Sequence, residues 1–440
     1  MIGTVQAPAP VTAAPGWSPL TRLAFRFCVV YCTLHCLLVT YLWFPLLGLL
    51  GRWIREYPGP WNTPFTDPVT GWVGRTVFGV DAVLRTDSGA GDQRAMWVLS
   101  FCLLVVAGVA ALVWTALDRR AEYPRLWAWF TLMLRLCLGA MMLSFGFAKL
   151  FPTQMPLPSL AQLLQPYGDL SPASVLWLQV GSSPVYEMAL GAVEVVAGLL
   201  LFVPRTAVLG AVLTGASMAQ VLLLNMTFDI PEKLLAGHLL VFSLVLLAPY
   251  LRRLVGVFVL ERACAPLSTP ALFTAERNNR IAAWLQLALG LWVALGCGYD
   301  RAVVWQEQYS AHSPKSELYG IWDVVEFTSD GQPRPPLTTD ESRWQRVVFD
   351  RPGTATYQRM NGELVPVGAE FGPSRQLELS TADARPFAVL SPEQPDADRL
   401  LLRGTLDGHE VVITLQRRDP DSFTLRNRGF HWVQDYPYFR

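Results

Sequence analysis

Long apolar stretches constrain what this chain can fold into more than any other feature of its sequence. A membrane-spanning helix needs about 20 predominantly apolar residues, because a backbone amide or carbonyl left unpaired in lipid costs several kcal/mol. Seven stretches meet that requirement, at residues 25–49, 96–117, 127–149, 185–203, 207–226, 234–251 and 281–304. The sequence therefore predicts a polytopic α-helical membrane protein with about seven transmembrane helices.

Composition and charge agree with a membrane location and exclude other classes. Hydrophobic residues make up 52% of the chain and charged residues 16%, against about 25% charged in soluble domains. These values exclude a disordered chain and an ordinary cytosolic enzyme. The 35 basic and 35 acidic side chains balance, so no overall field attracts a nucleic acid. The expected partner is the lipid bilayer, and protein partners stay open.

Hydropathy and charge divide the chain into segments. Residues 1–24 form an Ala- and Pro-rich leader that we expect to be disordered. Residues 25–125 hold two membrane helices and an extramembrane loop at 51–94, in which a short interfacial helix near 69–80 is expected. Residues 126–262 hold four further helices, and 263–314 hold the last helix and a linker. Residues 315–440 have the composition of a soluble domain.

Arginine distribution predicts the orientation, since cytoplasmic loops of membrane proteins are rich in Lys and Arg. Three clusters fall on one side of a seven-helix arrangement: Arg22 and Arg26; Arg119, Arg120 and Arg125; and Arg252, Arg253, Arg262, Arg277 and Arg280. We therefore expect a multi-pass protein of a bacterial inner membrane, with a cytoplasmic N-terminus and an extracytoplasmic C-terminal domain.

Ionisable residues inside the spans are candidates for a functional site. A charge at the bilayer centre costs at least ~2.5–3.5 kcal/mol, so it pairs or lines a cavity. Arg135 and Lys149 lie near one face of the third span, and Glu187 and Glu194 share a face of the fourth. We expect at least one of these cations to pair with one of these carboxylates. Such a pair can fix helix register or line a cavity, and both roles stay open.

Polar residues also gather between the fifth and sixth spans. Asn225, Asp229 and Lys233 surround Pro231, and His238 lies early in the sixth span. One interpretation is helix capping, since Asp and Asn side chains satisfy amides at helix ends. The other is the mouth of a cavity lined by the charges of the third and fourth spans.

Three cysteines recur at helical spacing in the first span. Cys28, Cys32 and Cys36 share one face, and His35 borders it. They form either a redox or metal site, since thiolate and imidazole are good ligands, or a stripe of small residues facing another helix. The chain contains no HExxH or di-iron ExxH spacing, so no metal is predicted.

Three stretches within 126–262 carry a family resemblance. They are RLCLGAMMLSFGFAKL at 135–150, EVVAGLLLFVPRTAVLGA at 194–211, and the segment 225–238. They are similar to the first helix, the second helix with its turn, and the junction of the third and fourth helices in the DoxX family. The resemblance implies a four-helix membrane module holding Arg135, Lys149, Glu194, Asn225 and Lys233. It implies quinone as the candidate cofactor, because some relatives are subunits of quinone-linked sulfur oxidation.

Short strands and tight turns predict a small antiparallel β-barrel at 315–440. Strands are expected at 319–328, 343–349, 354–360, 363–367, 376–380, 400–406, 410–416 and 422–425. Asn361-Gly362 and Asp407-Gly408 are strong two-residue hairpin turns. A sheet that closes on itself leaves no exposed edge, so closure is expected.

The first of these strands carries Gly320-x-Trp322. This pattern resembles the lipocalin signature, in which an arginine near the last strand packs on the tryptophan. Arg426 or Arg428 would be that arginine. The resemblance implies a cup for a lipophilic ligand, and the alternative is a solid barrel with Trp322 as a buried plug.

Two functions remain open from the sequence. The first is a quinone-linked redox component with a cavity between the third and sixth helices. RLAFRFCVVY at 22–31 and WFP at 43–45 also resemble the membrane module of vitamin K-dependent carboxylase-like proteins, which implies another quinone-using relative. The second is a non-catalytic scaffold or lipophile carrier whose barrel binds cargo or a partner. No catalytic residue is assigned, and the sequence does not decide whether the protein is an enzyme.

Overall fold

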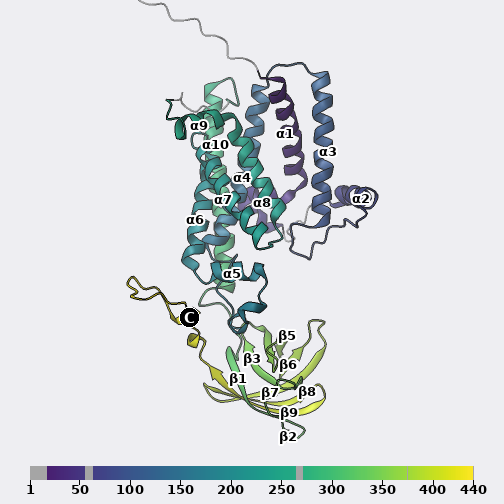
Figure 1. The fold of residues 1–440 in the computed structure, drawn as a ribbon, viewed down its shortest axis with the longest axis vertical. Coiled ribbons are helices and arrows are strands. Elements are labelled where there is room, and N and C mark those ends of the chain that lie inside the picture. The colour runs from purple at the N-terminus through teal and green to yellow at the C-terminus, as the bar shows by residue number, and fades with distance from the viewer. Residues whose placement is uncertain (1–16, 55–62, 264–270, 374, 440) are drawn as a thin grey trace, which may run out of the picture. The chain divides into compact units, whose positions relative to one another are not determined.

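The structure, a computed structural model, describes residues 17–54, 63–263, 271–373 and 375–439 (Figure 1). It separates into two compact units. A helical unit holds the described residues up to Phe151 together with Met188–Arg301. A barrel unit holds Pro152–Glu187 and the described residues from Ala302 onward.

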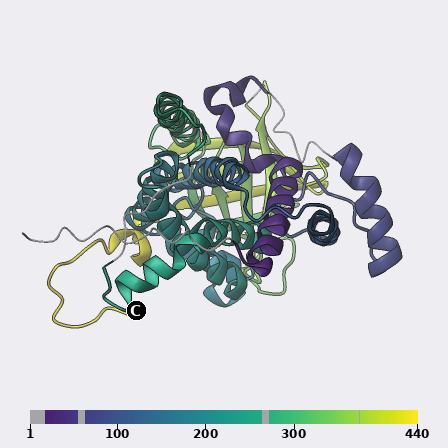
Figure 2. The same ribbon diagram turned by 90° about the horizontal axis from the view of Figure 1, so that it is seen from above.

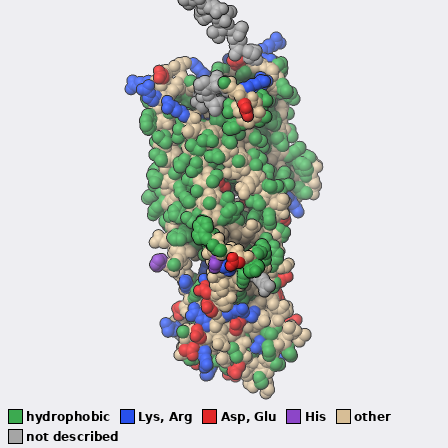
Figure 3. Space-filling view, turned by 60° about the vertical axis from the view of Figure 1, so that its left-hand side comes forward, with side chains coloured by type: hydrophobic (Ala, Val, Ile, Leu, Met, Phe, Trp, Pro, Cys, Tyr) green, Lys and Arg blue, Asp and Glu red, His purple; other side chains and the backbone are tan. Residues whose placement is uncertain are grey.

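The described part of the chain contains seven helices long and apolar enough to cross a membrane. They are α1 (Pro19–Leu38), α3 (Arg94–Leu117), α4 (Pro124–Leu150), α6 (Pro184–Phe202), α7 (Ala207–Thr227), the continuous pair α8 (Lys233–Leu247) and α9 (Leu251–Phe258), and α10 (Glu276–Gln308). Apolar side chains cover the outer face of the helical unit (Figure 3), as a lipid-facing surface requires. The predicted polytopic membrane fold is confirmed.

The first span differs from the expected helix at 25–49. Helix α1 begins at Pro19, capped by the Ser18 side chain, and ends at Leu38. Two 3₁₀ segments follow, η1 (Thr40–Leu42) and η2 (Phe44–Trp53). Pro45 lacks the amide that a continuing α-helix would need. Gly48 has a φ of +52° and contacts the Trp292 ring, so a side chain at this position would be strained and would clash.

A short helix, α2 (Thr63–Val73), precedes α3 and continues into a π-helical turn, η3 (Gly74–Phe78). Figure 2 looks along α3 and shows α2 lying across it. The helix begins a few residues before the interfacial helix expected near 69–80. Phe65, Trp72 and Phe78 are exposed. Exposed apolar side chains on a short helix that lies at a steep angle to a membrane-spanning helix are typical of an interfacial position.

Small residues allow α4 and α6 to approach closely. A Cβ atom on Gly191 of α6 would lie 2.5 Å from the Leu150 amide nitrogen of α4. A Cβ atom on Gly146 of α4 would lie 2.7 Å from the Val195 nitrogen. Glycines at such positions are typical of packed membrane helices. This contact brings the C-terminal turns of α4 against the middle of α6.

The barrel unit contains a closed antiparallel sheet. Its strands are β1 (Gly320–Ser329), β3 (Trp344–Phe349), β4 (Gly353–Arg359), β5 (Leu364–Phe371), β6 (Leu377–Ser380), β7 (Pro386–Asp396), β8 (Arg399–Leu406) and β9 (His409–Arg418). Each strand pairs with the next in that order, and β9 pairs back with β1. A two-residue strand, β2 (Gln332–Pro333), pairs antiparallel with the end of β1. The predicted closure of the barrel is confirmed.

One expected strand is absent from the barrel and one strand was not expected, so, apart from β2, the number of strands stays at eight. Residues 386–396 form β7, which is not among the expected strands. A register shift between Glu393 and Asp396 accommodates Pro395. The strand expected at 422–425 is instead a 3₁₀ turn, η7 (Pro420–Ser422), followed by the short helix α11 (Thr424–Asn427). Asp419 caps this turn through its side chain.

The connection between α4 and α6 packs on the barrel. It contains η4 (Gln162–Leu164), η5 (Tyr167–Asp169) and α5 (Pro172–Gly181). Leu160 is buried against Ile321 and Val348 on the outside of the barrel, and its amide donates to Asp350 Oδ2 at 3.1 Å. Four spans separate this connection from the barrel, so an even number of crossings returns the chain to the same membrane side.

Candidate functional site

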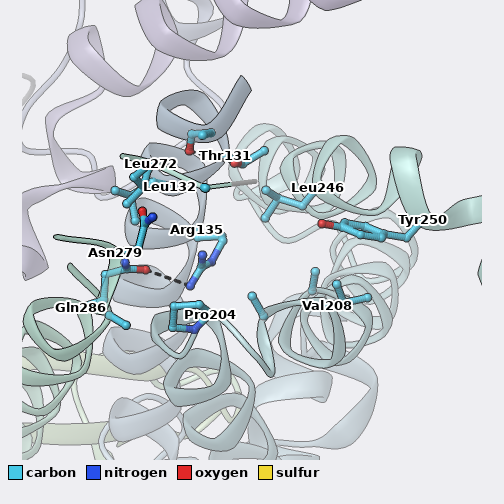
Figure 4. Close-up of a pocket in the computed structure, with 15 residues that line it drawn as sticks. Thr131, Leu132, Arg135, Pro204, Val208, Leu246, Tyr250, Leu272, Asn279 and Gln286 are labelled. Carbon is cyan, nitrogen blue, oxygen red and sulfur yellow. Dashed lines mark hydrogen bonds between the residues drawn. The ribbon is translucent and has the colours of Figure 1, made fainter. Parts of the chain in front are cut away.

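A cavity of about 240 Å³ lies within the helical unit (Figure 4). Its walls come from α4, the start of α7, the end of α8 with Tyr250, the segment before α10, and α10 itself. Polar side chains among the described lining residues are Thr131, Arg135, Tyr250, Asn279 and Gln286. The rest of the lining is apolar, as in most small-molecule sites.

Arg135 is the charged residue among the described residues that line this cavity, and hydrogen bonds to Leu201 and Gln286 fix its guanidinium. Its side chain is only 8% exposed. Nε and Nη2 donate to the Leu201 carbonyl oxygen at 3.0 and 2.8 Å, and Nη2 also donates to Gln286 Oε1 at 3.1 Å. Leu201 lies in the last turn of α6, where carbonyls lack helical partners. Arg135 therefore satisfies a helix end and is fixed in orientation by it.

The remaining guanidinium nitrogen, Nη1, is left for the cavity. Among the described residues it has no hydrogen-bond acceptor, and no carboxylate lies within ion-pair distance of Arg135. The sequence pattern allowed Arg135 to pair with a carboxylate of the fourth span, and it does not. Fourteen residues separate it from Lys149, about 21 Å along a helix. The two cations therefore lie at different depths although their faces agree.

Lys149 makes the expected pair. Its Nζ lies 2.7 Å from Glu194 Oε2, with both side chains buried between α4 and α6. The ammonium also lies 5.7 Å from the centre of the Phe145 ring. Glu187, one of the two expected partners, is buried at the start of α6, and its Oε1 accepts from the Met155 amide at 2.9 Å. Neither carboxylate lines the cavity.

The elbow between α7 and α8 is a capping structure. Asp92, from the loop before α3, accepts from the Lys233 and Leu234 amides, each at 2.8 Å. Lys233 Nζ lies 3.1 Å from Asp229 Oδ1, and Asn225 Nδ2 donates to the Glu232 carbonyl at 3.0 Å.

None of the elbow residues lines the cavity, so they do not form its mouth. The elbow and the cavity lie at different heights along the α8 axis. Tyr250 lies seventeen residues after Lys233, about 25 Å along a helix.

Glu232 is an ionisable residue of the elbow that the sequence analysis did not single out. Burial and the nearby Asp92 carboxylate together raise the pKa of its carboxyl to about 7, although a hydrogen bond from the Gly91 amide acts in the opposite direction. Its charge therefore changes near neutral pH. A Cβ atom on Gly91 would displace this carboxyl from its present position.

His238 stacks on His35 between α1 and α8. The ring centroids are 3.8 Å apart with an interplanar angle of 9°. His238 Nδ1 lies 2.7 Å from the Leu234 carbonyl oxygen, which can only accept, so Nδ1 donates. In the neutral ring Nε2 then accepts from the Tyr31 hydroxyl at 2.7 Å. His238 thus ties α1 to α8.

Cys32 and Cys36 lie in the buried apolar core beside these rings, and Cys28 packs against it. No three His, Cys, Asp or Glu side chains within the described ranges gather where one metal ion could bind. Cys32 and Cys36 share their core with Leu134 and Cys137 of α4 and with Phe242 of α8.

The barrel carries Trp322 as its buried plug. The side chain is 1% exposed, and its Nε1 donates to the Leu318 carbonyl at 2.8 Å. Gly320 begins the same strand, and Arg417 of β9 lies opposite Trp322 in the sheet register. The expectation that Arg426 or Arg428 stacks on Trp322 is wrong. Strand β9 ends at Arg418, and both arginines lie beyond it, in or next to the short helix α11.

The two expected arginines have other neighbours. Arg426 pairs with Asp421 at 3.3 Å, and the Arg428 guanidinium lies 5.0 Å from the Tyr438 ring centre. Leucine, valine and aromatic side chains from both halves of the sheet fill the barrel interior. A filled interior favours the solid barrel over a ligand cup.

Sequence reasoning missed Gln286, Tyr250 and Asp92 as partners of the candidate residues. It also treated Arg26 only as a topology signal. Arg26 is in fact buried, and its guanidinium donates to the Thr115 hydroxyl, the Asp118 carbonyl and the Tyr123 hydroxyl. Gln286, a polar residue within an apolar span, was a further signal that, together with Arg135, could have pointed to the cavity.

Comparison with known proteins gives limited information. A stretch of 85 residues is 39% identical to the uncharacterized protein YwoB of Bacillus subtilis (strain 168). It makes up 19% of this chain and 55% of that protein, so the chain spans about half the length of this relative. No family model matches the chain. No solved structure matches it.

Proposed function

We propose that the helical unit binds a lipid-soluble molecule with an oxygen-bearing ring, a quinone, in the cavity at Arg135. The protein would then be a DoxX-like membrane component of quinone-linked redox chemistry. The observation that carries this proposal is the Nη1 group of a buried arginine that faces a cavity and has no acceptor among the described residues. Arginine donates only, and a quinone carbonyl accepts only.

The size of the cavity supports a ring-sized head group. An apolar protein cavity of about 150 Å³ is large enough to bind benzene, whereas sites for drug-sized molecules range from about 300 to 1,000 Å³. The 240 Å³ here lies between these values. One substituted ring therefore fits, and an attached isoprenoid or acyl chain would remain in the surrounding lipid.

The second candidate is a non-catalytic lipophile carrier or scaffold. The filled interior of the barrel favours a version in which cargo binds among the helices and the barrel only docks. The Leu160 contact supports that docking role, because through it the connection between α4 and α6 packs on the barrel. This candidate uses the same cavity but requires no electron transfer.

Extraction of the purified protein tests the first candidate. Full-length protein in nonionic detergent should release a quinone into organic solvent, detected by mass spectrometry. Arg135→Gln should lower the amount recovered per protein about tenfold, the loss of one charge-assisted hydrogen bond. Arg399→Gln, at an exposed barrel position, serves as the matched control. Recovery of ordinary phospholipid alone, equal in all three proteins, would leave only the carrier candidate.

We further propose that the N-terminus is cytoplasmic and the barrel extracytoplasmic. The arginine clusters support this orientation. The hydrogen bonds of Arg26 to Thr115 and to the Asp118 carbonyl add that the start of α1 and the α3–α4 turn lie at one end of the unit.

Cysteine labelling tests the orientation. Ser391→Cys, on the outer face of β7, should react with an impermeant thiol reagent in intact spheroplasts. Ala121→Cys, exposed in the α3–α4 turn, should react only after lysis. The reverse pattern would place the barrel in the cytoplasm.

A further inference from the structure

We infer that the Arg135 cavity also takes an oxyanion head group, such as a carboxylate or a phosphate, and binds it more tightly than a neutral oxygen acceptor. This rests on the proposed function only in taking the cavity as a ligand site, and it does not require a quinone. It assigns the ligand a full negative charge, which the proposal of a neutral quinone does not.

The charge balance of the buried cations carries the inference. Lys149 has the Glu194 carboxylate at 2.7 Å. Arg26 reaches the Asp118 carboxylate through the Tyr123 hydroxyl, which donates to Asp118 Oδ2 at 3.2 Å. A buried charge in a membrane protein is expected to have such a partner.

Arg135 differs from these two cations. Its described partners are a backbone carbonyl and the Gln286 amide oxygen, both neutral dipoles. The fifteen described residues that line its cavity include no aspartate or glutamate. The missing countercharge therefore has one place to bind, the cavity that Nη1 faces.

The surroundings of the cavity would also attract an anion. Tyr250, in its wall, is within electrostatic reach of both Arg135 and Arg253. Asn279 lines the cavity next to Arg280 in the chain. Figure 3 shows Lys and Arg side chains, with Asp and Glu among them, at this end of the helical unit. The cations nearest to the cavity would raise the local concentration of an anion.

Two sources offer the same head-group chemistry. One is an amphiphile whose acyl chain lies in the lipid while its head occupies the 240 Å³. The other is a free oxyanion from the aqueous side. Both would place an acceptor oxygen on Nη1, since Nε and Nη2 are already bound to Leu201.

Binding of matched probes to the full-length protein in nonionic detergent tests the inference. Dodecyl phosphate should bind and raise the melting temperature, and dodecanol, with the same chain and no charge, should bind at least about tenfold more weakly. Inorganic phosphate distinguishes the sources: equal binding indicates a free oxyanion, and weaker binding an amphiphile. Equal binding of dodecyl phosphate and dodecanol would overturn the inference.

A carboxylate supplied by the protein gives the sharpest variant. Val208 lines the cavity, so Val208→Glu should provide the missing countercharge and abolish dodecyl phosphate binding. Val208→Gln occupies the same volume without charge and should retain most of it. This pair keeps the test valid if Arg135→Gln does not fold. Loss of binding in both variants alike would show that volume rather than charge controls the site, and would overturn the inference.

The two proposals fail separately. If a quinone is extracted and charged and neutral probes bind equally, the quinone proposal stands and the oxyanion inference falls. If dodecyl phosphate binds in a Val208→Glu-sensitive manner and no quinone is recovered, the reverse holds.

Discussion

Replacing Lys149 by Met should destabilise the helical unit by about 3–5 kcal/mol, because it leaves the Glu194 carboxylate buried without its cation. The pair lies 2.7 Å apart, and both side chains are less than one-tenth exposed. Gly146 and Gly191 hold the two helix backbones in close contact around it, so neither side chain can move to water. Unfolding in detergent, followed by circular dichroism, measures the change.

The double variant Lys149→Met/Glu194→Met separates charge from packing. Removing both charges leaves no isolated ion, so the double variant should recover most of the lost stability. An exposed pair provides the control. Glu276→Gln breaks the bridge to Arg280, whose side chains are 90% and 73% exposed, and should change stability by less than about 1 kcal/mol. A loss of similar size in the double variant would show that the ion pair itself is not what stabilises this contact.

The membrane spans could be read from the sequence because hydropathy over about 20 residues is a local property. The exception is informative. The first apolar stretch was read as one helix to residue 49, and the chain leaves the α-helix after Leu38. Pro45 was a visible signal of this break. The close approach of Gly48 to the Trp292 ring was not, because Trp292 belongs to a helix distant in the sequence.

The candidate site was predicted in part. Helical periodicity correctly placed Lys149 and Glu194 on facing sides, but it says nothing of depth along the axis. Arg135 therefore belongs to a different part of the molecule from Lys149. Asp92 caps a helix that begins 141 residues later in the chain, and no local pattern reveals such a partner. The cavity itself depends on where five chain segments meet.

The barrel shows the same division. The Asp407-Gly408 turn was predictable because two-residue hairpins have strong local preferences, and Leu406 pairs directly with His409. The turn at Asn361-Gly362 was also placed correctly, but it is longer than two residues, because β4 ends at Arg359 and β5 begins at Leu364. Strand β7 was missed because prolines such as Pro392 and Pro395 usually exclude a strand. Pro395 lies in a register shift, whereas Pro392 is paired with Leu402. The arginine opposite Trp322 was misassigned because register, not sequence spacing, decides which residues face each other.

Replacing Trp322 by Ala should destabilise the barrel by about 3–5 kcal/mol, the loss seen when a large buried ring becomes a methyl group. The ring is 1% exposed and lies in the barrel core. Hydrogen exchange in the full-length protein measures the effect, since amides of β1, β3 and β9 should lose protection together if the closed sheet opens as one unit.

Two further substitutions show which property of Trp322 matters. Trp322→Phe retains much of the apolar volume but leaves the Leu318 carbonyl without its indole donor, so it should cost about 1–3 kcal/mol. Trp432→Ala removes the same side chain from a position that is 91% exposed, and barrel exchange should not change. If Trp322→Ala leaves barrel exchange as it is in the Trp432→Ala control, the plug is dispensable. The sheet would then owe its closure to its strand pairing, and the tryptophan of the Gly320-x-Trp322 pattern would have no part in stability.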